Sequence, residues 1–184
     1  AGLLILPIPL ASFIAGPLAG LALPRLGETR ILWTSLTLTG CALAAYLVSH
    51  DGPVWLWLSA LAVMGFGVGA AMTAASSVIM LSAPEDRAGM AASIEEVSYE
   101  LGGALGIALL GSLMSALYSR AMIVPVGLPP VVADSLDEAL MVAETMSPAR
   151  ASEMARLARA AFDQAFVGVI GVAILLLLVV AFGI

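Results

Sequence analysis

Five apolar runs, each long enough to cross a lipid bilayer, constrain the fold of this chain more than any other feature. They cover residues 3–23, 31–48, 54–81, 89–118 and 166–184. A helix needs about 20 mainly apolar residues to cross the hydrocarbon core. Of all residues, 61% are hydrophobic and only 11% are charged, whereas a soluble domain is about half apolar and about a quarter charged. We therefore predict an all-α integral membrane protein with five transmembrane helices.

The polar residues exclude several classes of function. Thirteen acids stand against seven arginines, with no lysine, so no basic patch is available and nucleic acid is not an expected partner. Cys41 and His50 are the only cysteine and histidine, so no disulfide within the chain is possible and no metal cluster is indicated. The loops contain no nucleophile–base pair, so we expect neither an enzyme nor a cofactor.

The arginines predict how the chain crosses the membrane. The connections 24–30 and 82–89 carry three arginines, whereas 49–53 carries none. The positive-inside rule therefore places the first two connections in the cytoplasm and the third outside. The long connection 119–165 contains four arginines and six acids. We expect it outside, because long loops follow the charge rule less strictly.

The long connection also contains helix signals. Ser135 with Glu138 three residues later forms a capping box, and Ser147 before Pro148 is a second helix start. After it, Met154, Leu157 and Ala161 share one helical stripe. These signals predict an extracytoplasmic helical hairpin that runs into the last span and acts as a lid over an outward vestibule. A solvated surface loop is the alternative.

Three glutamates stand out in the fourth run, at positions 95, 96 and 100. At 1.5 Å per residue, Glu95 lies roughly 12 Å and Glu100 roughly 20 Å beyond Arg87. Charged groups at such depth are costly and mark an ion or substrate path. Burial favours the protonated form of a carboxyl group, so a site that binds either a proton or an organic cation would exchange the two. Alternatively, a span starting at Val97 would make Glu95 and Glu96 first-turn acids stabilised by the helix N-terminus.

Small and helix-breaking residues suggest close packing and movement. Pairs of glycines four residues apart let helix backbones approach closely; they are Gly16/Gly20, Gly65/Gly69 and Gly102/Gly106. Prolines at positions 7, 9 and 17 predict that the first span is broken or curved, as in many transporters.

Three stretches resemble a known family: GPLAGLALPRLGETR (16–30), GFGVGAAMTAASSVIMLSAPEDRAGMAASIEEVSYELGGALGIALLGSL (65–113) and the segment 134–166. They resemble the fourteen-helix drug:H⁺ antiporters of the major facilitator superfamily, in particular exporters of the QacA and SmvA type. The resemblance implies a C-terminal fragment containing the last five helices of the C-terminal bundle, with the N-terminal helices of the same protein missing. It also implies a multi-pass protein of the bacterial inner membrane. The paired glutamates of the family fall on Glu95 and Glu96.

The resemblance further implies a function. Members export lipophilic organic cations, such as quaternary ammonium compounds and dyes, in exchange for protons, driven by the proton gradient. The superfamily's cytoplasmic loop motif falls on Gly20, Arg25, Gly27 and Arg30. Pro24 replaces the acid of that motif, which puts a charge-relay latch in doubt. A non-transporting membrane subunit or scaffold, or a facilitator of a neutral solute, are the alternatives.

Overall fold

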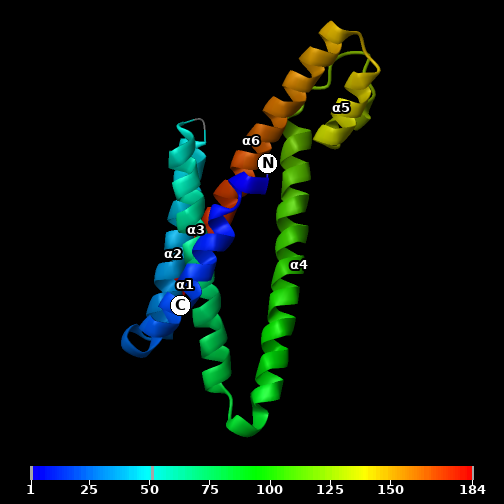
Figure 1. Cartoon of the computed structure of the whole chain (residues 1–184). Helices are drawn as coiled ribbons and strands as arrows, with labels where there is room; N and C mark the ends of the chain where they lie inside the picture. The colour runs from blue at the N-terminus through cyan, green and yellow to red at the C-terminus, as the bar shows by residue number, and fades with distance from the viewer. Residues whose placement is uncertain (1, 51, 184) are drawn as a thin grey trace. The chain divides into compact units, whose positions relative to one another are not determined.

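The computed structural model describes residues 2–50 and 52–183, and every regular element in this part of the chain is helical (Figure 1). Five helices are long and apolar enough to cross a membrane: α1 (Pro7–Leu26), α2 (Glu28–Ser49), α3 (Val54–Ser82), α4 (Ala88–Ala121) and α6 (Pro148–Gly183). The short elements are η1 (Gly2–Leu4), η2 (Glu85–Arg87), η3 (Pro130–Ala133) and α5 (Leu136–Glu144). The prediction of an all-α chain with five membrane-length helices is confirmed.

The chain divides into two compact units. The first extends to Gly102 and includes the end of α6 from Val172. It contains α1, α2 and α3, and its buried residues Ala15, Ala19, Ile31, Ala70 and Ala74 form one cluster. The second unit is Gly103–Gly171 and contains α5.

Helix α3 packs against both α1 and α2 through glycines. A Cβ at Gly65 would lie 2.7 Å from the Cα of Ile8, and a Cβ at Gly69 would lie 2.7 Å from the Cα of Ser12. On the opposite face, a Cβ at Gly67 would lie 2.9 Å from the carbonyl oxygen of Ser35 on α2. Because a real Cβ cannot approach backbone atoms this closely, the two interfaces depend on these glycines.

The end of α6 packs against α2 within the first unit. A Cβ at Gly40 would lie 3.4 Å from the Leu178 side chain, at the short end of ordinary van der Waals contact. The rings of Trp33 and Phe182 meet edge to face, with centroids 6.1 Å apart. Such aromatic pairs add stability beyond the area that they bury.

The prolines of α1 leave the helix unbroken, so the first of the two predicted forms, a broken or a curved span, is wrong. Pro7 begins the helix and Pro9 lies in its first turn, where backbone amides have no helical partner anyway. Pro17 and Pro24 lie inside the helix, which is assigned without interruption from Pro7 to Leu26. A membrane helix tolerates an internal proline because its neighbours can compensate for the lost hydrogen bond.

The connection between α1 and α2 is much shorter than the predicted segment 24–30. It consists of Gly27 alone, whose amide donates to the Leu23 carbonyl at 2.9 Å and whose carbonyl accepts from Ile31. Gly27 has φ +79° and ψ 156°, a backbone region that is essentially restricted to glycine. One residue therefore ends α1 and begins α2.

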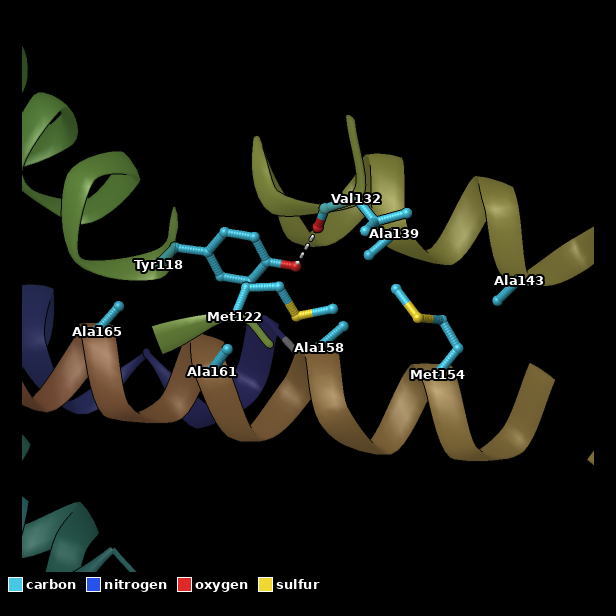
Figure 2. Packing of buried hydrophobic residues seen from close by; sticks show 9 residues of the cluster. All are labelled: Tyr118, Met122, Val132, Ala139, Ala143, Met154, Ala158, Ala161 and Ala165. Atoms are coloured by element: carbon cyan, nitrogen blue, oxygen red, sulfur yellow. Dashed lines mark hydrogen bonds between the residues drawn. The ribbon is translucent and has the colours of Figure 1, made fainter. Parts of the chain in front are cut away.

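The second unit has its own small core, shown in Figure 2. Its buried members come from the end of α4 and the residue after it, from η3, from α5 and from α6: Tyr118, Met122, Val132, Ala139, Ala143, Met154, Ala158, Ala161 and Ala165. The Tyr118 hydroxyl donates to the Val132 carbonyl at 3.2 Å, and the Ser119 hydroxyl donates to the Ala133 carbonyl at 2.6 Å. These two hydrogen bonds hold η3 against the end of α4.

Helices α5 and α6 begin at the residues that the sequence indicates. The Ser135 side chain accepts a hydrogen bond from the Glu138 amide at 3.2 Å and caps α5. Pro148 is the first residue of α6, which continues without a break through the segment predicted as the last span. The stripe that α6 buries differs in one residue from the prediction, because Ala158 is fully buried and Leu157 only partly.

Candidate functional site

The three glutamates lie well inside α4. The preceding chain turns at Pro84 and η2, and α4 begins at Ala88 with no acid in its first turn. Glu95 is therefore about two helical turns from the helix start. The interpretation of Glu95 and Glu96 as first-turn acids is wrong, because the dipole effect of a helix end fades within one turn.

The carboxylates have no partners within the described part of the chain. Glu95 is half-buried, whereas Glu96 and Glu100 are exposed. No hydrogen bond or ion pair involves any of the three among residues 2–50 and 52–183. Glu96 and Glu100 are four residues apart and share a face, while Glu95 lies about 100° around the helix. The arrangement presents acids in two directions from one helix.

Neighbouring polar groups do not neutralise these acids. The hydroxyls of Ser93 and Ser98 donate to carbonyls of their own helix, at 3.0 Å to Gly89 and 2.7 Å to Ile94. Arg120 in the last turn is the basic residue of α4. It follows Glu100 by 20 residues, or about 30 Å along the helix axis. The local environment therefore favours binding of a positive species over a negative one.

The surface of α4 around the acids is apolar and exposed. Among its exposed side chains are Ile94, Val97, Leu101, Leu105 and Ile107. These residues lie on several faces rather than along one stripe, a pattern that is typical of a helix surrounded by protein or lipid.

The predicted packing glycines differ in what surrounds them. Gly65 and Gly69 contact the backbone of α1, as described above, and a Cβ at Gly16 would lie 3.4 Å from the Thr73 hydroxyl. At Gly20, Gly102 and Gly106, a Cβ would meet no described atom within 4 Å. Gly67 has no second glycine four residues away, so a search for glycine pairs at that spacing does not select it. Its position between Gly65 and Gly69 in the run GFGVG is the signal that could have identified it.

The residues of the predicted loop motif lie at the α1–α2 turn. Arg25 occupies the last turn of α1 and Arg30 the first turns of α2, and both are exposed. Pro24 has no amide hydrogen, so position 24 gives the Gly20 carbonyl no helical hydrogen bond. Glu28 supplies an acid in the first turn of α2, where the helix dipole stabilises it.

No metal site emerges from the side chains that the structure describes. In residues 2–50 and 52–183, no group of three or more His, Cys, Asp or Glu side chains could hold a metal ion.

Comparison with known proteins gives a consistent family. The Major Facilitator Superfamily model matches residues 1–184. The methyl viologen resistance protein SmvA of Salmonella typhimurium is 33% identical over 169 residues, covering 88% of this chain and 34% of SmvA.

Two mycobacterial relatives have related names. The multidrug efflux pump LfrA of Mycolicibacterium smegmatis is 32% identical over 186 residues, covering 98% of this chain and 37% of LfrA. The drug efflux pump JefA of Mycobacterium tuberculosis is 32% identical over 138 residues, covering 75% of this chain and 26% of JefA. The chain thus spans about a third of the length of SmvA and LfrA.

Proposed function

Because the chain belongs to the Major Facilitator Superfamily, we propose that it is the C-terminal part of a proton-coupled exporter of lipophilic organic cations. Glu95 and Glu96 are the proposed exchange sites, with Glu100 as a third carboxylate on the same helix. The single observation that carries this proposal is the group of three unpaired acids inside the apolar helix α4. The names of LfrA and JefA support the export of drugs, and the name of SmvA supports resistance to methyl viologen.

The sign of the charge supports a cationic substrate. The arginines of the long helices lie near their ends, at Arg25, Arg30, Arg120 and the first turns of α6. An anion in the middle of the span would find no basic side chain there among the described residues. Methyl viologen, the compound in the name of SmvA, is an organic cation and fits a site that prefers positive charge.

The chemistry of exchange follows from competition for the same oxygens. A carboxyl group shielded from water holds a proton, because burial favours its neutral form. An organic cation that enters the site favours the carboxylate and so displaces the proton. If each carboxylate accepts one or the other, inward movement of protons drives outward movement of the cation.

The rest of the protein is required for transport. Alternating access needs two repeats that move about a shared site, and this chain spans about a third of its relatives. The upstream helices are proposed to cover the exposed face of α4 that carries Glu96 and Glu100. The turn at Gly27 and η2 are proposed to face the cytoplasm. Residues 49–53 and the segment with α5 are proposed to face outside, the latter as a lid.

The test uses the full-length parent protein in liposomes. Proton release is recorded with a pH-sensitive dye after addition of methyl viologen, for the native protein and for Glu95→Gln, Glu96→Gln and Glu100→Gln. Glu85→Gln is the matched control, because Glu85 belongs to η2 and precedes the helix. Membrane insertion and thermal stability are measured for each variant.

We expect Glu95→Gln or Glu96→Gln to abolish proton release while the variant still inserts and Glu85→Gln behaves as the native protein. A facilitator of a neutral solute would release no protons even in native form. A scaffold would neither release protons nor move methyl viologen, and either result would reject the proposal. Unchanged release in all three α4 variants would also reject it.

A further inference from the structure

The second unit contains a cavity that is not lined by any of the three glutamates of α4. Its volume is about 510 Å³, within the range of roughly 300–1,000 Å³ that is typical of small-molecule sites. It lies between the segment after α4 and the first turns of α6, and all its lining residues belong to this unit.

The walls of this cavity are mostly apolar and adaptable. They include Ile123, Val126, Leu128, Met146, Met154 and Leu157. Ile123 and Val126 are strongly exposed although both are large and apolar, so the cavity opens onto uncovered apolar surface. Methionine side chains are flexible and polarisable, and they suit surfaces that accept ligands of varied shape.

The two charged residues at the cavity differ in whether they form an ion pair. Arg150 and Glu153 both line it. Glu153 lies 3.7 Å from Arg156 in an exposed ion pair, whereas Arg150 has no hydrogen bond or ion pair to any described residue. Arg150 also lies in the first turn of α6, which contains no acid, so the positive end of the helix dipole adds to its charge. The cavity therefore favours a negative group beside Arg150.

The position along α6 indicates where the ligand comes from. Leu157 and Arg150 precede Phe166, the start of the predicted last span, by nine and 16 residues. These separations correspond to about 14 Å and about 24 Å along the helix. A ligand at Arg150 is thus well outside the hydrocarbon core, which favours a molecule dissolved in water over a membrane lipid.

We propose that this cavity binds a dissolved amphipathic organic anion. Its apolar body lies against Ile123, Val126 and the two methionines. Its carboxylate or sulfonate head binds the guanidinium of Arg150, because a guanidinium can donate two parallel hydrogen bonds to such a group. This site is separate from the glutamates of α4 and has the opposite charge preference.

The test measures binding of 8-anilinonaphthalene-1-sulfonate to the full-length protein in lipid nanodiscs, with empty nanodiscs subtracted. Arg150→Gln should weaken binding about tenfold, as expected for loss of a charged hydrogen bond. Glu153→Gln should strengthen binding about threefold, because it removes the negative charge beside Arg150. Arg159→Gln is the matched control, since Arg159 is exposed on the same helix but does not line the cavity, and it should change binding less than twofold.

Three results would overturn the proposal. One is a signal no larger than that of empty nanodiscs, and another is equal binding by the native protein and Arg150→Gln. The third concerns the cationic dye ethidium. If ethidium binds more tightly to Arg150→Gln and more weakly to Glu153→Gln than to the native protein, the cavity prefers cations. Proton release by methyl viologen is not part of this assay, so its outcome is independent of the exchange proposal.

Discussion

The hydroxyl of Ser12 on α1 donates a 2.6 Å hydrogen bond to the backbone carbonyl of Gly65 on α3. The same contact brings the two backbones together, because Gly65 and Gly69 have no side chain to separate them. Helices in membranes gain little from the hydrophobic effect and associate through such close packing and interhelical hydrogen bonds. The Ser12–Gly65 hydrogen bond and the close backbone contact therefore hold α1 tightly against α3 in the first unit.

Alanine at Gly65 or Gly69 should destabilise the protein. The added Cβ would overlap the α1 backbone, and overpacking of this kind costs about 1–3 kcal/mol. Thermal unfolding of the full-length protein in detergent measures the effect. Gly171→Ala is the control, because a Cβ there meets no described atom within 4 Å. If all three variants unfold at the same temperature, the close α1–α3 contact is not what stabilises this pair of helices.

Ser12→Ala should have a smaller effect than Gly65→Ala. Interhelical hydrogen bonds in membrane proteins contribute about 0.6 kcal/mol on average. The Gly65 carbonyl lies within α3 and keeps its own helical acceptor role after the substitution. We expect Ser12→Ala to lower the unfolding temperature slightly and Ser12→Val to lower it more, since Ser12 lies against Gly69. A loss in Ser12→Ala as large as that in Gly65→Ala would contradict this order.

Gly27 should tolerate no other residue, including asparagine. Asparagine often replaces glycine in the left-handed helical region, but the ψ of 156° at Gly27 lies outside that region. Strain at such a position costs about 1–3 kcal/mol. Gly27→Asn and Gly27→Ala should therefore destabilise the full-length protein equally in thermal unfolding. Gly20→Ala serves as the control inside α1, where a Cβ meets no described atom within 4 Å. Rescue by asparagine alone would show that the turn adopts a different conformation.

The sequence predicts the long helices and the acids better than it predicts the contacts. Run length alone identifies five spans, and Glu95, Glu96 and Glu100 stand out because their surroundings are apolar. The α1–α2 turn is harder to predict, because Pro24 usually ends a helix, yet here α1 continues to Leu26. Gly67 is missed because close packing against Ser35 depends on where α2 lies. Likewise, Ala158 replaces Leu157 in the buried stripe of α6 because tertiary packing, rather than hydrophobicity, decides which residue is covered.

Tyr118→Phe should loosen the segment between α4 and α5. Tyr118 is only 2% exposed, and its hydroxyl donates to the Val132 carbonyl. Removing the donor leaves that buried carbonyl without this partner, which costs about 1–3 kcal/mol. Hydrogen–deuterium exchange of the full-length protein should show faster exchange in residues 122–134 and unchanged exchange in α2. Tyr46→Phe, in the first unit, provides the comparison. Equal protection of residues 122–134 in both variants would mean that the Ser119–Ala133 hydrogen bond alone holds η3.

Ser135→Ala should unfold α5 locally. This helix has nine residues, and helices shorter than about 12–15 residues are marginal without outside support. The Ser135 side chain caps its first turn through the Glu138 amide, and loss of such a cap costs about 0.5–2 kcal/mol. Limited proteolysis of the full-length protein should then cut within residues 134–147 faster than in the native protein. Ser135→Asp should restore resistance, because aspartate is also a strong N-cap. Ser152→Ala, at an exposed position inside α6, should leave the cleavage rate unchanged. If Ser135→Ala is cut no faster than the native protein, packing of Ala139 and Ala143 in the core of the second unit, rather than capping, determines the stability of α5.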